Sequence, residues 1–182
     1  VKEFFDCEYF GKLPVKYKDD LQMYKVKGLK PEYSFNEEGV IPNEAFRIKF
    51  GLIQFTDIPE IILDKLEMDL PGHLFYHNVK HTVDVVTEVE LIGWAEGCSD
   101  EEILVLKTAA LFHDAGHIIV YDNHEYYGTQ IAREILPVFN YTSHQIDRIC
   151  TLIMSTKLPP KPTNLLENII CDSDLDYLGR SD

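Results

Sequence analysis

The sequence predicts a mostly α-helical domain that follows a small β-hairpin. After residue 57, apolar residues recur at helical spacing in successive stretches, most of them bounded by capping residues, proline or glycine. Before residue 33, apolar residues alternate with polar ones as they do in strands. Hydrophobic residues make up 45% of the 182-residue chain, which is enough for a packed core. Together these observations predict an all-α bundle of about six helices behind a two-stranded hairpin.

The hairpin is expected in residues 1–32. Leu13, Val15 and Tyr17 alternate with other residues, and Asp19-Asp20 offers a turn before a second apolar run that ends at Gly28. A hairpin of this size is marginally stable alone and needs a partner surface. An exposed hairpin can pair with a second copy of the chain, so a homodimer is a candidate assembly.

The helical domain is expected over residues 57–182, after a connector at residues 33–56. Within the connector, residues 46–55 fit a short strand and a short helix equally well. Four helix starts are expected where a capping residue stands three positions before an acidic or amide residue: Asp57 with Glu60, Ser99 with Glu102, Thr142 with Gln145, and Asn164 with Glu167. Two more helices are expected, one from about residue 74 to 93 and one from residue 122 or 123 to the residue before Pro137.

Composition excludes several classes of function. The formal net charge of −14 argues against partners such as nucleic acid or an anionic membrane, which bind basic surfaces. No apolar run approaches the ~20 residues of a membrane helix. The four cysteines form no CxxC pair, and their wide spacing is typical of a reduced, cytoplasmic protein. Both chain ends fall in mid-pattern, so we expect a piece of a longer protein.

Two histidine clusters are the candidates for chemistry. His77 and His81 stand four residues apart in a predicted helix, where both would lie on one face. His113 and Asp114 follow a buried apolar run, where an unpaired charge would be costly. A metal ion would pair the carboxylate and fix the imidazole tautomer. A purely structural hydrogen bond between His113 and Asp114 is the alternative.

A third candidate is an aspartate embedded in the apolar pattern of the last predicted helix. Asp174 and Asp172 are the two candidates. Mixed histidine and aspartate ligands suit divalent Mn, Fe, Ni, Zn or Mg. Such an ion can activate water and polarise a phosphoryl oxygen.

The ordered set of His81, His113-Asp114 and Asp174 resembles the HD superfamily of metal-dependent phosphohydrolases, an all-α fold named for its His-Asp doublet. The resemblance covers roughly residues 57–182. Tyr76-His77-Asn78 with His81 is also similar to the opening motif of cyclic nucleotide phosphodiesterases in the same superfamily. The resemblance implies that the ordered set consists of metal ligands. Asp174 is preferred as the late aspartate, because family members usually place a small residue before this ligand and a leucine soon after it, as Ser173 and Leu175 do here; Asp172 is the alternative. It implies that His77 is the general acid.

Some HD proteins bind two metal ions through extra histidines. His117 and His124 stand at plausible places for a second metal or for substrate. The next histidine that the resemblance implies falls near residues 155–157, where this sequence has none. Lys157, in that segment, is a candidate phosphate contact.

The N-terminal segment carries a second, shorter resemblance. Residues 9–18 (YFGKLPVKYK) and 23–29 (MYKVKGL) resemble the closing hairpin of class III nucleotide cyclase domains. The metal-binding aspartates of that family lie upstream of this hairpin, and Asp19 stands where the family often has glycine. The segment is therefore expected to be a cyclase remnant and not a working cyclase. An ordinary amphipathic hairpin is the alternative.

The predicted function is hydrolysis of a phosphoester of a small nucleotide or cyclic nucleotide by a metal-activated water. The alternative is a non-catalytic sensor or regulatory HD module that binds metal or nucleotide in a signalling protein. The intact ligand set favours the enzyme, because a binding module need not retain it. A third hypothesis, an oxygenase with two irons, requires the extra histidine that is missing near Ser155.

Overall fold

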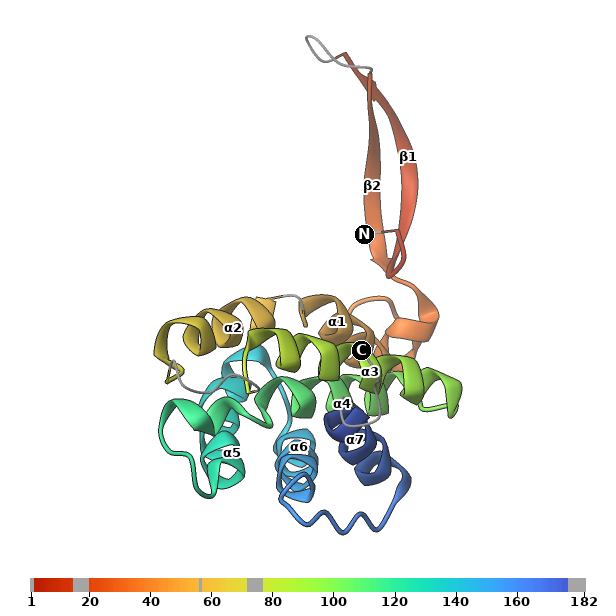
Figure 1. The fold of residues 1–182 in the computed structure, drawn as a ribbon. Coiled ribbons are helices and arrows are strands. Elements are labelled where there is room, and N and C mark those ends of the chain that lie inside the picture. The colour runs from red at the N-terminus through yellow and green to blue at the C-terminus, as the bar shows by residue number, and fades with distance from the viewer. Residues whose placement is uncertain (1, 15–19, 56, 72–76, 177–182) are drawn as a thin grey trace. The chain divides into compact units, whose positions relative to one another are not determined.

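The computed structural model describes residues 2–14, 20–55, 57–71 and 77–176 and divides the chain into two compact units, Val1–Gly51 and Leu52–Asp182. Seven α-helices and one two-stranded sheet lie in the described residues, as Figure 1 shows. The predicted fold class, mostly helical with a small hairpin, is confirmed. No helix in these ranges is both long and apolar enough to cross a membrane.

The first unit is built on the hairpin. Strands β1 (Phe5–Leu13) and β2 (Leu21–Leu29) pair antiparallel, with Phe5 opposite Leu29 and Leu13 opposite Leu21. Two bulges interrupt the register. Val15, Tyr17 and Asp19, on which the prediction partly rested, lie outside the described residues.

A small aromatic cluster anchors the base of the hairpin. The Phe4 ring packs edge-on against Tyr33 and Phe46, with ring centroids 5.1 Å apart in both pairs. Two short 3₁₀ turns, η1 (Pro31–Tyr33) and η2 (Phe35–Glu37), lead to helix α1 (Glu44–Gln54). The segment at residues 46–55, for which strand and helix were equally compatible with the sequence, is therefore helical up to Gln54.

The second unit, Leu52–Asp182, is built mainly from a bundle of α-helices, and its helix α2 begins at Asp57, where the sequence predicts a helix start. Helix α4 contacts α2, α3, α5, α6 and α7, and it lies in the middle of the bundle (Figure 1). After its acidic first turn, every residue of α4 from Ile103 to Phe112 is buried except Lys107. The bundle elements are α2 (Asp57–Asp69), α3 (Val79–Ala95), α4 (Asp100–Phe112), η3 (Ala115–Ile118), α5 (His124–Ile135), η4 (Leu136–Phe139), α6 (Ser143–Ser155) and α7 (Leu165–Leu175).

Capping residues set most of the helix starts. Ser99 and Thr142 form reciprocal capping boxes at α4 and α6, as predicted. The Asn164 side chain accepts a hydrogen bond from the Glu167 amide at the start of α7. Asn123 precedes α5 in the left-handed conformation, with φ 64°, and makes no side-chain cap.

The start of α3 differs from the prediction. The helix begins at Val79, because Asn78 takes an extended conformation (φ −130°, ψ 173°) and its side chain caps the His81 amide at 3.0 Å. His77 therefore precedes the helix. The expectation that His77 and His81 share a helical face is wrong, but both side chains still lie beside Asp114, with their ring centroids 6.0 Å apart.

Candidate metal centre

Two histidines and two aspartates from three helices converge in the second unit. His81 comes from α3, His113 and Asp114 follow α4, and Asp174 comes from α7. The His81 Nε2 and His113 Nε2 atoms lie 3.0 and 3.3 Å from Asp174 Oδ1. The same two nitrogens lie 3.6 and 3.4 Å from Asp114 Oδ2. We call these four residues the first cluster, and their spacing allows one cation to contact several of them at once.

The tautomer of His113 is fixed by the end of its own helix. Its Nδ1–H donates to the Ala110 carbonyl oxygen at 2.7 Å, so Nε2 is the atom that faces the other ligands. His113 is 1% exposed, and the helix delivers it into the bundle because the preceding residues of α4 are buried. The buried residues at the end of α4 thus place His113 Nε2, a candidate ligand atom, inside the core.

The charges of the first cluster are strongly coupled. Burial alone would lower the pKa of His113, but Asp114 and Asp174 raise this pKa to about 10. Burial also opposes ionisation of Asp114, yet His113 and two further histidines hold the pKa of its carboxyl well below the usual range. The cluster therefore combines buried carboxylates with a positive charge, and a divalent cation can take the place of that charge.

The two candidate aspartates of α7 face opposite ways. Asp174 stands four residues after the buried Ile170 and reaches the histidines, whereas Asp172 is exposed. The geometry therefore brings Asp174 into the first cluster and leaves Asp172 outside.

His77 lies at the rim of the first cluster. Its Nδ1 is 2.7 Å from Asp114 Oδ2, and 27% of its side chain is exposed. His113 is almost fully buried by comparison. His77 is thus the histidine of this group that solvent or a ligand can reach.

The second cluster consists of Asp114, His117 and His124. The second carboxylate oxygen of Asp114, Oδ1, lies 3.4 Å from His124 Nε2 and 3.8 Å from His117 Nε2. The two imidazole rings stack with centroids 3.7 Å apart. His124 Nδ1–H donates to the Tyr121 carbonyl oxygen at 3.1 Å, so its Nε2 is also free to act as a ligand atom.

His117 is the least satisfied polar group in the described part of the chain. It is 2% exposed, and neither ring nitrogen has a hydrogen-bond partner there. Burial lowers the pKa of His117 to about 4, so the ring is neutral at physiological pH. An unpartnered buried nitrogen is costly, and a cation beside Asp114 and His124 would satisfy it.

Comparison with known proteins agrees with this geometry. The family model for the HD domain matches residues 78–176, more than half of the chain. The chain belongs to the HD domain family. This family consists of metal-dependent phosphohydrolases, whose HD domains bind divalent metals, and the residues of both clusters lie within the matched range.

Two relatives extend the comparison. The crystal structure of a predicted HD superfamily hydrolase from an uncultured Thermotogales bacterium superposes with a TM-score of 0.54 at 24% identity. It covers 65% of this chain and 67% of that chain, and it shows a shared fold. An uncharacterized protein from Clostridium beijerinckii is 34% identical over 76 residues, which are 40% of this chain and 48% of that protein. The match thus spans about half of that relative.

The comparisons give no support to the cyclase resemblance of the N-terminal segment. The HD domain match begins at residue 78, after the hairpin. The hairpin itself is observed, but its assignment as a cyclase remnant gains nothing from these comparisons.

A glycine allows the two histidines of the second cluster to meet. A Cβ atom on Gly116 would lie 1.9 Å from the His124 carbonyl oxygen, so η3 and the start of α5 touch through their backbones. Gly128 makes a similar approach, because its Cβ would lie 2.7 Å from the Phe112 carbonyl oxygen. Sequence reasoning missed this role of Gly116, for which the only signal was a glycine between the candidate ligands.

Lys157 lies outside both clusters of the HD domain. Its Nζ donates to Asn123 Oδ1 at 2.8 Å and is exposed. It thus bridges the end of α6 to the residue before His124. The nearby Ser155 accepts a hydrogen bond from the Cys171 thiol through its carbonyl oxygen at 3.2 Å and belongs to neither cluster.

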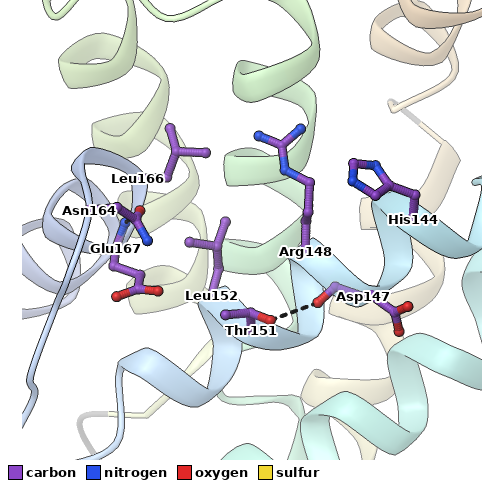
Figure 2. A pocket seen from close by; sticks show the side chains of 8 residues that line it. All are labelled: His144, Asp147, Arg148, Thr151, Leu152, Asn164, Leu166 and Glu167. Carbon is purple, nitrogen blue, oxygen red and sulfur yellow. Dashed lines mark hydrogen bonds between the residues drawn. The ribbon is translucent and has the colours of Figure 1, made fainter.

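A cavity of about 380 Å³ lies on another part of the HD domain, along α6 and the start of α7 (Figure 2). No member of either cluster lines it. Arg148 pairs with Glu101 at 3.9 Å, and Asp147 pairs with Arg133 at 2.8 Å, so its main charges are already engaged. The lining residues are His144, Asp147, Arg148, Thr151, Leu152, Asn164, Leu166 and Glu167.

Proposed function

We propose that this HD domain hydrolyses a phosphoester of a nucleotide or cyclic nucleotide with a water activated by a divalent cation. The proposal rests on one observation: two buried imidazoles and two carboxylates from three separate helices point their ligand atoms at one another within 3.0–3.6 Å. Groups of this kind are costly to bury unless they pair with one another or hold a cation, and a cation can contact several of them at once. The roles below follow from that arrangement.

The residues of the first cluster fit a cation of the borderline or hard type. When bound, a divalent cation makes water acidic enough to attack phosphorus and neutralises charge on the phosphoryl oxygens. His81, His113, Asp114 and Asp174 would hold it. Mixed nitrogen and oxygen ligands accept Mn, Fe, Ni, Zn or Mg, so the donor set leaves the choice of metal open.

Asp114 can serve both clusters at once. Its Oδ2 faces the first cluster, and its Oδ1 faces His117 and His124. We assign His117 and His124 to a second cation or to the substrate phosphate. The buried ring nitrogens of His117, which lack a hydrogen-bond partner among the described residues, favour the cation.

His77 is the proposed proton donor to the leaving oxygen. It is partly exposed beside Asp114, whereas the histidines behind it are buried. Its contact with the Asp114 carboxylate orients the ring, as the role of a general acid requires. Lys157 contacts Asn123, the residue before His124, and is therefore a candidate contact for a substrate phosphate.

The proposed partner is a small phosphorylated molecule. The net charge of −14 disfavours a nucleic acid, whose phosphates need a basic surface. A compact phosphoester can instead meet its positive charge locally, at the cation and His77.

The test combines metal content with turnover. The purified chain would be loaded with each candidate metal and assayed against phosphomonoesters, phosphodiesters and cyclic nucleotides. We expect turnover that depends on the metal, and we expect His113→Ala and Asp114→Ala to lose both metal and activity. Asp172→Asn is the matched control, because this exposed carboxylate on α7 lies outside the clusters.

Two results would count against the proposal. Turnover that survives in a metal-free His113→Ala variant would show that the cluster is not the catalytic site. Tight metal binding with no turnover of any ester would favour the non-catalytic sensor instead.

A further inference from the structure

Three rings cover the buried imidazole of His117. His124 stacks on it at 3.7 Å between centroids, His77 lies at 4.5 Å, and Tyr121 lies at 5.4 Å with its plane tilted by 42°. His77 and His124 belong to the proposed chemistry. The third ring, from Tyr121, has no role in it, yet it belongs to the same layer of side chains.

Tyr121 combines high exposure with a fixed backbone. The residue is 61% exposed, whereas His117 beneath it is 2% exposed. Its carbonyl oxygen accepts from His124 Nδ1 at 3.1 Å, and the preceding Val120 amide donates to the Gly116 carbonyl oxygen at 3.0 Å. The turn that carries the ring is thus tied to the second cluster on both sides.

Packing of the fold does not account for this ring. Within the part of the chain that the structure describes, the Tyr121 hydroxyl has no hydrogen-bond partner, and the only ring that Tyr121 contacts is His117. Ile119, two residues earlier, is also exposed, at 56%. Exposed apolar surface beside a polar centre is typical of a place where a ligand binds.

An exposed aromatic ring offers a face on which planar groups stack. Stacking of a base on an aromatic side chain is tolerant of base identity, because every base presents a π face. A substrate whose phosphate lies at Asp114 and His124 would place its adjoining group beside this ring. A flat group would gain contact there that an alkyl or sugar group of the same charge would not.

We propose that Tyr121 is a specificity-determining residue that stacks on the planar group of the substrate, so that the site selects aromatic, nucleoside-like phosphoesters over aliphatic ones. The inference rests on the proposed function for the position of the phosphate. It adds a residue and a selectivity that the metal ligands do not supply.

Ligand binding to the metal-loaded chain tests the inference without requiring turnover. The probes are adenosine 5′-monophosphate and ribose 5-phosphate, which share the phosphate and the sugar and differ in the base. Calorimetry on wild type should show tighter binding of the nucleotide. Tyr121→Ala should weaken nucleotide binding by roughly tenfold and leave ribose 5-phosphate within about twofold. Tyr121→Phe should keep the preference, because it keeps the ring.

Tyr126→Ala is the matched control. Tyr126 is also an exposed tyrosine, at 47%, but its ring packs on Tyr127 and contacts neither cluster. This variant should bind both probes as wild type does. Metal content and thermal stability of Tyr121→Ala should match wild type, which separates a lost contact from a disturbed site.

Three outcomes would overturn the inference. They are equal binding of the two probes by wild type, equal weakening of both probes in Tyr121→Ala, and unchanged nucleotide binding in that variant. Selective loss of nucleotide binding in a chain that turns over no ester would support Tyr121 and refute the proposed hydrolysis. The experiment can therefore refute the role of Tyr121 and the proposed hydrolysis independently of each other.

Discussion

The two clusters share Asp114 but are built differently. The first cluster depends on long-range packing, because α3, α4 and α7 each deliver a ligand from a distant part of the sequence. The second is local, because His117 and His124 lie in η3 and at the start of α5, just beyond Asp114. The first cluster therefore depends on the packing of the whole bundle, whereas the second depends on the contact between η3 and the start of α5.

The electrostatics of the clusters also differ. In the first, two carboxylates raise the pKa of His113 to about 10, so one positive charge already offsets part of their negative charge. In the second, burial lowers the pKa of His117 to about 4, and this neutral ring has no hydrogen-bond partner among the described residues. We therefore expect His113 to release a proton when the first cluster binds a cation. His117 is already neutral, so it can contact a cation without releasing one. The first cluster has two carboxylates, whereas the second has only the shared Asp114. We therefore expect an ion to bind more tightly at the first cluster.

Replacing the shared ligand should have the largest effect. Asp114→Asn keeps the shape of the side chain and removes its charge from both clusters. We expect loss of both ions and a fall in kcat/KM of at least about 1000-fold, which corresponds to the several kcal/mol that metal catalysis supplies. Elemental analysis and initial rates would measure this, with Asp172→Asn as the control. Retention of two ions by Asp114→Asn would show that Asp114 does not bridge.

Removing the unpartnered imidazole should separate the clusters. His117→Ala takes a ligand from the second cluster and leaves His81, His113 and Asp174 in place. We expect the chain to bind one ion with wild-type affinity and the second with affinity lowered about 10- to 100-fold. Calorimetric titration with Mn²⁺ would resolve the two steps. Simultaneous loss of both ions would mean that the clusters form one inseparable site.

A methyl group at Gly116 should weaken cation binding at the second cluster, because it would separate the backbones that carry His117 and His124. The added Cβ of Gly116→Ala would lie 1.9 Å from the His124 carbonyl oxygen, so η3 and α5 must move apart. We expect about 1–3 kcal/mol of lost stability and a weaker second ion with the first ion retained. Gly93→Ala is the control, because its Cβ would press on the end of the Ile103 side chain, away from both clusters. If the control weakens the second ion equally, general destabilisation is the cause.

The pH dependence of metal binding should distinguish the clusters. Without a cation, His113 holds a proton below its pKa of about 10, and the cation must displace that proton. The affinity of the first ion should therefore rise about tenfold per pH unit between about pH 6 and 8, with release of about one proton. His117 contributes no such dependence in this range, because its pKa of about 4 lies below it. Titration calorimetry in buffers of different ionisation enthalpy counts the protons, and a first-ion affinity independent of pH would contradict this account.

Local rules made much of this architecture predictable. Ser99 and Thr142 cap helices where the sequence places a capping box, because that signal spans only four residues. The preference for Asp174 over Asp172 comes from the family resemblance, and the structure adds a physical reason, because Asp174 lies one helical turn after the buried Ile170. The sequence showed which residues could form the first cluster. The distances between their side chains depend on how α3, α4 and α7 pack.

Other features were not accessible from sequence patterns. Asn78 ends the helical pattern before His77, although the apolar spacing is compatible with an earlier start. The approach of Gly116 to His124 depends on backbone contact between two elements, for which side-chain periodicity carries no information. The role of each candidate ligand stays a prediction until an ion is measured.

The smallest expected effect lies at the far end of α4, the helix that carries His113. Ser99 accepts from the Glu102 amide, and Glu102 accepts from the Ser99 amide at 2.8 Å. The hydrogen bonds from the Ser99 backbone and side chain lower the pKa of Glu102. Ser99→Ala should cost about 1 kcal/mol, or about 2–4 °C in Tm, and leave metal content unchanged.

The Ser99–Glu102 cap should also make the stability of the chain depend on pH. Because the folded pKa of Glu102 is lowered, its stabilisation is present above the unfolded pKa and is lost as pH falls through the folded pKa. The difference in Tm between wild type and Ser99→Ala should therefore shrink as the solution is acidified. A loss of bound metal in this variant would show instead that the start of α4 is coupled to its end. The first cluster would then depend on the whole helix and not on its last turn alone.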